Sequence, residues 1–323
     1  MKRWGEYRDN GIKPAKRVLS RWVNDMRYEY RQLNDRDGSV YAEITGCDGA
    51  LRFSAIPDEL NGLPVRALGD HAFSGRKDLE EIRIPAGVRK LGRFCFYDCP
   101  SLRRIALTDV TDDIGDGAIR ECSSLRWIEV TVSHGSYRAV KDLADDSKAE
   151  LHFRIFTPAE CCLVFPAWHS EDREDTHARA IHPGIGGAGY AYRQTVTRTE
   201  MLFRDYDALF EKAAADGVQT AAEVALWRLA RPVSLSAEAE RIYVDYLTQH
   251  AGGVLLHLTE NGGTEDRELL RVLLDSAKPD SCAVSEAIDA ASAAEQTEIC
   301  SMLMEYDRRN KAEGDAGPEI FVL

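Results

Sequence analysis

The chain has 323 residues, of which 44% are hydrophobic, and its formal net charge is −13. This composition supports a sizeable core and argues against wholesale disorder, and the length allows two domains or one extended array. The negative charge lies mostly after residue 198, where eleven Lys and Arg stand against twenty-four Asp and Glu. A surface of that sign repels a phosphate backbone, so we expect no nucleic acid partner.

The cysteines and the start of the chain bear on the compartment. Eight cysteines are too sparse and too irregularly spaced for a disulfide scaffold. The first residues, Met1 to Tyr7, include charged side chains and contain no apolar core of a secretory signal. No stretch approaches the roughly eighteen apolar residues of a membrane span. These features predict a cytoplasmic protein without a membrane span, and no motif indicates a cofactor.

The N-terminal region, residues 1–38, contains a candidate amphipathic helix over residues 14–31. Pro14 suits the first turn of a helix. Apolar residues recur on one face at helical spacing: Val18, Leu19, Trp22, Met26 and Tyr30. We predict that this basic helix caps the open end of a repeat array, because such arrays need capped ends. The alternative is peripheral association with a membrane surface or an acidic partner.

Three segments, residues 65–84, 88–107 and 111–130, align without gaps at a period of 23 residues. Each carries Leu-Gly or Ile-Gly near its start and ends in L-x-x-I-x-[I/L/V]. A period of this length with this ending is typical of a leucine-rich solenoid, in which stacked coils bury a common core. The alternating run Leu151–Ile155 predicts a terminal strand one period further on, so we place the solenoid at residues 39–156.

The region from about residue 40 to residue 130 also carries a set of spaced motifs. They are Gly-Leu-Pro-Val at 62–65, Leu-Gly-x-x-Ala-Phe at 68–73, Ile-Pro at 84–85, Leu-Gly-x-x-Cys-Phe at 91–96 and Asp-Cys-Pro-Ser-Leu at 98–102. This set resembles the BspA-like leucine-rich repeat family, with departures at Arg76, where Cys is expected, and at Ile119, where Phe is expected. The resemblance implies a right-handed solenoid of short strands used for protein binding, often at cell surfaces. The start of this chain shows no secretion signal of the kind that surface members need.

Within each repeat ending, the residues between the apolar ones should face away from the core, because side chains alternate along a strand. They are Glu81, Arg83, Arg104, Ala106, Trp127 and Glu129. Trp and Arg are the residue types that anchor protein interfaces. We predict that these six form the face that binds a protein partner. The alternative is that Trp127 packs on the junction segment, residues 157–198, while the charges pair across strands.

Residues 157–198 form a junction in which the sequence predicts short strands at Cys161–Phe165 and Tyr190–Val196. The glycine-rich stretch between residues 183 and 189 lacks the strand-to-helix context of a phosphate loop, so we expect a hinge. Five potential ligands or nucleophiles also lie here: Cys161, Cys162, His169, His177 and His182. An enzyme or metal protein that uses these residues is the alternative hypothesis. We do not favour it, because their spacing matches no known zinc site and no third catalytic group accompanies them.

From Thr199 the pattern becomes helical, and we predict an array of helices over residues 199–310 followed by a loose tail, residues 311–323. Thr220 with Glu223 fits a capping box at a helix start. Gly252 and Gly253 predict the end of another helix. Near the end of the array, the pattern Glu268-Leu269…Leu273-Leu274 recurs thirty residues later as Glu298-Ile299…Leu303-Met304. Paired short helices at that spacing make the array loosely ankyrin-like.

The sequence therefore predicts an α+β chain, in which a short leucine-rich solenoid precedes an all-helical, ankyrin-like array. The function that it favours is non-catalytic protein–protein recognition, with no catalytic residues and no metal. It identifies neither the partner nor the oligomeric state.

Overall fold

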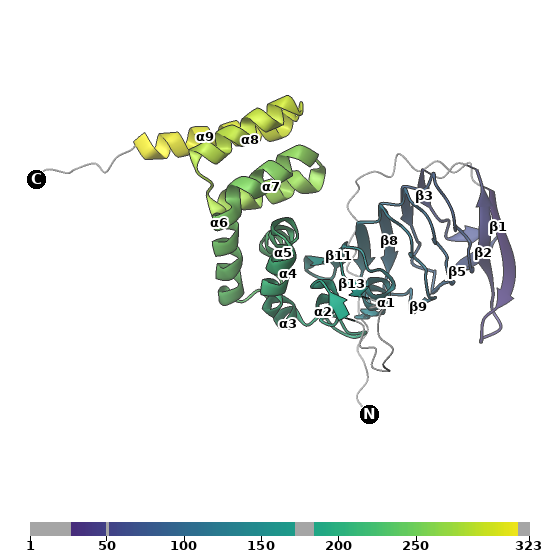
Figure 1. Ribbon diagram of the computed structural model, residues 1–323. Helices are drawn as coiled ribbons and strands as arrows, with labels where there is room; N and C mark the ends of the chain where they lie inside the picture. The colour runs from purple at the N-terminus through teal and green to yellow at the C-terminus, as the bar shows by residue number, and fades with distance from the viewer. Residues whose placement is uncertain (1–26, 50–51, 172–183, 316–323) are drawn as a thin grey trace, which may run out of the picture.

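The computed structural model describes residues 27–49, 52–171 and 184–315. A solenoid occupies one end of the molecule and a helical region the other (Figure 1). The solenoid makes about five turns over residues 42–156, so the predicted α+β architecture is confirmed. Residues 14–26 of the candidate N-terminal helix, together with His177 and His182, lie outside the described residues.

Two sheets form the solenoid. Sheet A has the strand order β1-β2-β5-β7-β9, with the short β4 beside β5. Its strands are β1 (Arg27–Asn34), β2 (Val40–Asp48), β4 (Glu59–Leu60), β5 (Leu63–Leu68), β7 (Lys90–Leu91) and β9 (Asp113–Ile114). Sheet B has the order β12-β11-β10-β8-β6-β3. Its strands are β3 (Phe53–Ala55), β6 (Glu81–Arg83), β8 (Arg104–Thr108), β10 (Trp127–Thr131), β11 (Leu151–Phe156) and β12 (Glu160–Phe165).

The 23-residue period is visible as a parallel register in sheet B. Ile82 of β6 pairs with Ile105 of β8, which pairs with Ile128 of β10, at 23 residues each. The last step is two residues longer, because Ile128 pairs with Phe153 of β11. Close backbone stacking requires glycine after the repeated Leu or Ile at two of the three positions, 92 and 115. A Cβ on Gly92 would lie 2.4 Å from backbone atoms of the coil before it, and one on Gly115 would lie 2.5 Å from such an atom. The repeated glycine therefore marks the position at which the backbones of successive coils are in contact.

One position of the repeat donates a hydrogen bond to the coil before it. The thiol of Cys99 donates to the Phe73 carbonyl at 3.1 Å, and the thiol of Cys122 to the Phe96 carbonyl at 3.0 Å. Arg76 occupies the same position one coil earlier, and its guanidinium donates to the carbonyl of Gly49 at 2.5 Å. Its departure from the family pattern therefore keeps the interaction and changes the donor.

The N-terminal end of the solenoid corrects one prediction. Residues 27–31, assigned to the basic helix, belong to strand β1, which pairs antiparallel with β2 at the end of sheet A farthest from the helices (Figure 1). The reason is that burial alternates there with period two, and Tyr28 and Tyr30 turn toward the core.

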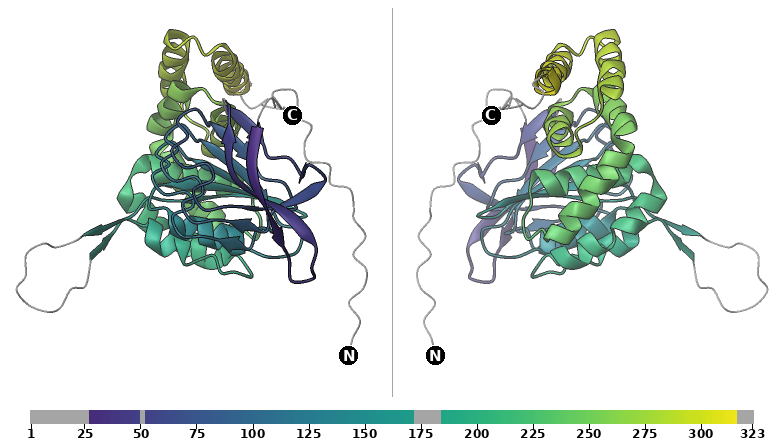
Figure 2. Two further views of the ribbon diagram at one scale, coloured as in Figure 1. Left: turned by 90° about the vertical axis from the view of Figure 1, so that its right-hand side faces the viewer. Right: turned by 90° about the vertical axis from the view of Figure 1, so that its left-hand side faces the viewer.

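At the other end, β12 runs antiparallel to β11 and confirms the predicted strand at Cys161–Phe165. Tyr206 protects this last strand, because its hydroxyl accepts from the Val164 amide at 3.0 Å and donates to the Val164 carbonyl at 2.7 Å. Helix α1 (Arg138–Asp146) links β10 to β11. Beyond β12, β13 (His169–Glu171) and β14 (Gly184–Gly186) pair as a two-stranded arm that projects from the body (Figure 2).

The strand predicted at Tyr190–Val196 is wrong, since helix α2 (Gly189–Arg193) begins there. The two neighbours Tyr192 and Arg193 are both buried, which an alternating strand with one exposed face does not allow. The Arg193 guanidinium donates to five backbone carbonyl oxygens, including those of Ala144 and Pro166 at 2.7 and 2.6 Å. Burial lowers the pKa of Arg193 to about 10.

The helical region contains α3 (Phe203–Ala208), α4 (Phe210–Asp216), α5 (Val218–Ala230), α6 (Ala237–Asn261), α7 (Thr264–Ala277), α8 (Ser281–Ala293) and α9 (Thr297–Asp315).

Two predictions about helix ends in this region are wrong. Helix α6 continues through Gly252 and Gly253, because Ala251, Val254 and Leu255 around them are buried and offset the low helix propensity of glycine. Helix α5 begins after Gly217, so Thr220 and Glu223 are interior residues and form no capping box.

The ankyrin-like character of these helices is not confirmed. None of the helices in the described residues is long and apolar enough to cross a membrane.

Candidate functional site

The six residues predicted for partner binding lie together on sheet B. Glu81, Arg104 and Trp127 occupy one row across β6, β8 and β10, and Arg83, Ala106 and Glu129 occupy the next. We call this surface the strand face; β11 extends its two rows with His152 and Arg154.

Helices α5 and α7 divide the strand face into two halves. The covered half consists of β10, β11 and β12. Helix α5 packs against β12, its Trp227 meets Trp127 of β10, and its Glu223 lies 3.0 Å from His152 of β11. The open half consists of β3, β6 and β8, where Arg83 is exposed and Glu81, Arg104 and Ala106 are half-buried. The prediction that this face binds a partner therefore concerns mainly the open half.

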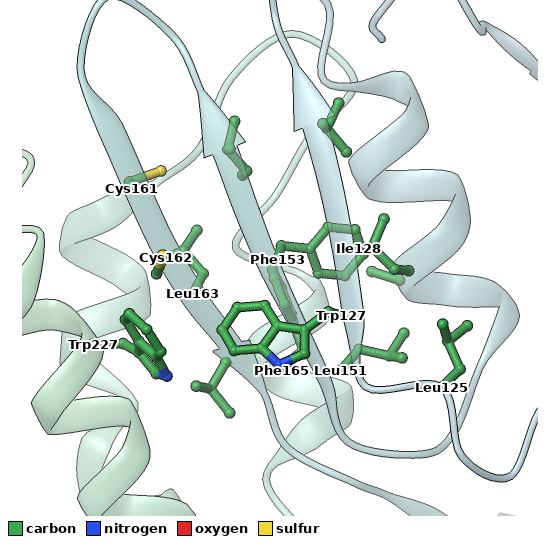
Figure 3. Close-up of a cluster of buried hydrophobic side chains, with 14 of the residues drawn as sticks. Leu125, Trp127, Ile128, Leu151, Phe153, Cys161, Cys162, Leu163, Phe165 and Trp227 are labelled. Atoms are coloured by element: carbon green, nitrogen blue, oxygen red, sulfur yellow. The ribbon is translucent and has the colours of Figure 1, made fainter. Parts of the chain in front are cut away.

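Trp127 lies in the covered half and is 8% exposed. Its indole meets the indole of Trp227 from α5 edge-on, with ring centroids 5.3 Å apart (Figure 3). The imidazole of His152 lies with its centroid 4.9 Å from that of Trp127. The Arg154 guanidinium lies over both indoles, 5.4 and 5.7 Å from their centroids. Trp127 thus packs, but its indole meets α5 and β11 rather than the junction that the sequence suggested.

Charged side chains also link the strand face to the helices. Arg104 pairs with Glu129 across strands and with Glu265 of α7 at 2.7 Å. Arg154 lies 3.7 Å from Glu268 of α7, which also pairs with Arg231. The strand-face charges therefore pair partly with each other, as the alternative predicted, and partly with carboxylates of α7.

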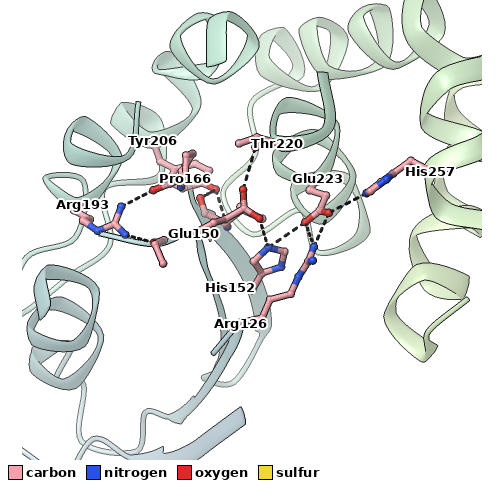
Figure 4. A network of polar contacts seen from close by, with 11 residues as sticks. Arg126, Glu150, His152, Pro166, Arg193, Tyr206, Thr220, Glu223 and His257 are labelled. Carbon is pink, nitrogen blue, oxygen red and sulfur yellow. Dashed lines mark hydrogen bonds and ion pairs between the residues drawn. The ribbon is translucent and has the colours of Figure 1, made fainter. Parts of the chain in front are cut away.

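Glu223 of α5 is the centre of a polar network, which we call the Glu223 network (Figure 4). One nitrogen of Arg126 lies 2.6 Å from each of its carboxylate oxygens. The Nε2 atom of His152 lies 3.0 Å from Glu223 and 3.2 Å from Glu150. His257 of α6 approaches Glu223 to 3.8 Å. These contacts join the end of the solenoid to two helices.

Burial and pairing compete for the pKa values of this network. Burial alone raises the pKa of Glu223, but hydrogen bonds from His152 and His257 hold it well below its usual value. Burial lowers the pKa of His152, yet its hydrogen bonds to Glu150 and Glu223 outweigh burial and raise it. The Glu223 hydrogen bond raises the pKa of His257. The network therefore favours charged histidines and a charged Glu223.

Among the described residues, Glu150, His152 and Glu223 are also the one group whose ligand atoms converge enough for a metal ion, within 4.8 Å of one another. Carboxylate and imidazole ligands suit zinc. However, Arg126 already contacts both oxygens of Glu223, and an imidazolium at His152 with Arg126 balances the two carboxylates. The arrangement fits an ion-pair network better than it fits a metal centre.

The Cys and His residues singled out in the junction have a different environment. Cys161 and Cys162 are neighbours on β12 and both are buried, whereas His169 is exposed on β13. Burial raises the pKa of Cys161 to about 12 and that of Cys162 to about 11. This disfavours the thiolate that a metal ligand or nucleophile requires.

A pocket of about 180 Å³ lies between the solenoid and the helices, and we call it the interdomain pocket. Its walls include Arg126, Trp127 and His152 from the solenoid, and Glu223, Trp227 and Asp266 from the helices. Sequence reasoning missed it because these residues are spread over more than a hundred positions. Trp127 was identified only through its place in the repeat.

The repeat architecture agrees with comparisons to known proteins. Residues 56–139 match the family described as BspA type leucine rich repeat region, in six copies. These residues are therefore a leucine-rich repeat region of the BspA type, as the motifs indicated.

Solved structures with similar regions are also leucine-rich repeat proteins. A T. pallidum leucine-rich repeat protein is 28% identical over 31% of this chain and 50% of its own length, with a TM-score of 0.29. A leucine-rich cell surface protein from Faecalibacterium prausnitzii is 26% identical over 33% of this chain and 35% of its own, with a TM-score of 0.26. A leucine-rich repeat protein from Bacteroides ovatus is 18% identical over 36% and 48%, with a TM-score of 0.22.

The chain thus covers half or less of each of these structures. No curated protein matches the sequence.

Proposed function

We propose that this chain is a non-catalytic protein-recognition module that binds its partner on the open half of the strand face. The observation that carries the proposal is the division of one sheet face by α5 and α7. The helices cover β10 to β12 but leave Arg83 exposed and Ala106 half-buried on β6 and β8. A rigid sheet with a helical wall on one side is a preorganised surface, which lowers the entropic cost of binding.

The chemistry of the open half suits a polypeptide. Arg83 stands between the short side chains of Ala55 and Ala106 in one row. An arginine flanked by small residues can reach a carboxylate or a backbone carbonyl of a partner. Glu81 in the adjoining row supplies a hydrogen-bond acceptor. The surface therefore offers a positive and a negative charge beside two short apolar side chains. Such a mixture is typical of protein interfaces that form reversibly.

A photo-crosslinking amino acid placed at position 106 tests the proposal, with the same residue at position 77 as the matched control. Lys77 is exposed on the loop before β6 and is not one of the strand-face residues. We expect a specific adduct only from position 106. The purified partner should then bind Arg83→Glu and Ala106→Arg at least about tenfold more weakly than the unchanged chain, while Lys77→Glu binds normally. Equal binding by all three variants contradicts the proposal.

A further inference from the structure

We infer that strand β1 is a self-association surface, on which β1 of a second copy of this chain pairs antiparallel about a two-fold axis. Such an interface uses the same residues on both copies, so the surface must be complementary to itself. The association is separate from the proposed function, because it uses the edge of sheet A and not the strand face of sheet B. Strand β1 is the terminal strand of sheet A and lies at the end of the solenoid that faces the viewer in the left view of Figure 2.

The backbone of β1 has a free edge. Strands β1 and β2 keep one unbroken register from Tyr30 to Asn34, and in the turn beyond it the Asp35 amide donates to the Ser39 carbonyl at 2.8 Å. Bonded and non-bonded pairs alternate in an antiparallel ladder, so every second residue directs its N–H and C=O away from β2: Tyr30, Gln32 and Asn34. In the described part of the chain, no other strand pairs with this edge.

The two ends of the solenoid differ in how their edges are protected. At β12, the Tyr206 hydroxyl occupies the backbone groups of Val164. Strand β1 is eight residues long and contains no proline. Edge strands that stay unpaired in native proteins are commonly very short, interrupted by proline or covered by another element. The described residues show none of these devices at β1, which leaves the edge available to a further strand.

Apolar surface is exposed at the same end of the solenoid. Side chains of the first strands pack against the core but are only partly buried: Tyr28, Tyr30, Leu60 and Leu63. Val40 of β2 is 40% exposed. The terminal coil of a solenoid has no neighbour on one side and needs a cap. A second copy paired at β1 would place the two terminal coils end to end and cover part of this surface.

The charges on β1 are complementary to themselves in one register. Arg27, Glu29 and Arg31 are exposed, whereas Tyr28 and Tyr30 alternate with them and turn toward the core. With the two-fold axis at Tyr30, Glu29 of each copy lies opposite Arg31 of the other, which makes two ion pairs. With the axis at Glu29 or at Arg31, two like charges lie opposite each other on the axis. Opposite charges stabilise a cross-strand pair and like charges destabilise it, so the register centred on Tyr30 is favoured.

This register also satisfies the backbone. With Tyr30 opposite Tyr30, the outward N–H and C=O groups of the two copies bond to each other at the axis. Glu29 and Arg31 then form a non-bonded pair, the kind in which opposite side chains are closest. Arg31 already pairs with Glu43 of β2, but its side chain is 62% exposed and can reach a second carboxylate. Glu29 forms no ion pair with any described residue and is free to supply that carboxylate.

Sedimentation velocity of the full chain over a range of protein concentrations tests this association. We expect a reversible dimer with twice the mass of the 36.1-kDa chain. Glu29→Arg and Arg31→Glu should each weaken dimerisation by at least about tenfold, because two attractive pairs become two repulsive ones. An equimolar mixture of the two variants should dimerise again, since each copy then supplies the charges that the other lacks.

A backbone variant and a charge control accompany these two variants. Gln32→Pro removes an outward N–H and should abolish the dimer, while a free strand edge tolerates the proline. Arg36→Glu is the matched control, because Arg36 is exposed in the turn after β1 and the change in charge equals that of Arg31→Glu. It should dimerise like the unchanged chain. Thermal unfolding of each variant checks the fold, above all for Arg31→Glu, which also loses its pair with Glu43.

A chain that is monomeric at every concentration overturns the inference. So does a dimer that Glu29→Arg or Gln32→Pro leaves intact, because the interface then lies elsewhere. A mixture of the two charge variants that stays monomeric, or an Arg36→Glu variant that loses the dimer equally, contradicts the register centred on Tyr30. Partner binding by the strand face is tested independently at positions 83 and 106.

Discussion

The covered and open halves of the strand face share one strand register but have different environments. In the covered half, aromatic rings and ion pairs are shielded by α5 and α7, and Trp127 is almost fully buried. In the open half, the equivalent row positions carry exposed or half-buried side chains. The same repeat position can therefore serve stability in one coil and recognition in another. Which role it serves depends on residues a hundred positions away.

The largest difference between the halves should appear when the Glu223 network is broken. Glu223→Ala leaves His152 without its carboxylate partner in a buried site and also removes the partner of Arg126, whose side chain is partly exposed. We expect a loss of about 3–5 kcal/mol in the free energy of unfolding, as for removal of one member of a buried ion pair. Urea titration followed by circular dichroism measures it. Glu211→Ala, at an exposed position of α4, is the control and should change little; similar losses in both variants would contradict the assigned importance of Glu223.

The pH dependence of stability should distinguish the halves next. The raised pKa values of His152 and His257 mean that their contribution is complete below about pH 6.5, the unfolded value, and is lost as pH rises through the folded values. The lowered pKa of Glu223 means that its contribution is present above about pH 4.5 and is lost on acidification. The docking of the helices should be most stable between these limits. In His152→Gln, the free energy of unfolding should fall less steeply as pH rises above about 6.5 than it does in the unchanged chain. An identical pH profile for both proteins would mean that His152 does not contribute to the pH dependence.

Arg104 lies at the border of the two halves, and its removal should have an intermediate effect. Arg104→Ala loses partly exposed pairs with Glu129 and Glu265, so we expect about 1 kcal/mol of destabilisation. A double-mutant cycle with Glu265→Ala measures the part that crosses to α7. A coupling energy of zero would show that this pair does not help to hold α7 on the sheet.

The smallest effect on folding should come from the open half. Arg83→Ala should change the free energy of unfolding by no more than about 0.5 kcal/mol, because Arg83 is exposed and away from the buried pairs. Chemical denaturation measures this value. A larger loss would mean that the residue supports the solenoid and is not free for a partner.

The solenoid could be predicted from the sequence because every coil repeats the same physical demands. The glycines at 92 and 115 are required by backbone contact, and the row positions follow from strand alternation. Even the departure at Arg76 keeps a donor to the preceding coil. By contrast, strand β1 was missed because the four-residue spacing of Met26 and Tyr30 fits a helix as well as a strand. The spacing of apolar residues alone did not distinguish the two structures.

The interdomain contacts could not be predicted because local patterns pointed elsewhere. Thr220 and Glu223 have the spacing of a capping box, yet Thr220 donates to Glu150 at 3.0 Å and Glu223 binds Arg126. Gly252 and Gly253 fit a helix end, but buried neighbours keep α6 continuous. In each case tertiary packing outweighs a local preference of about 1 kcal/mol. A single sequence does not reveal which distant residue supplies that packing.

The antiparallel turn into β12 also determines where gene duplication can alter this protein. A new coil must pair in parallel with both neighbours, as β8 does with β6 and β10. Beyond β12 the Tyr206 hydroxyl already occupies the backbone groups of Val164. Added coils can therefore enter between β3 and β10, where each would lengthen the open half by one strand spacing, about 4.8 Å. Variants of this architecture are expected to differ there by whole periods of about 23 residues, with the helical region carried along unchanged.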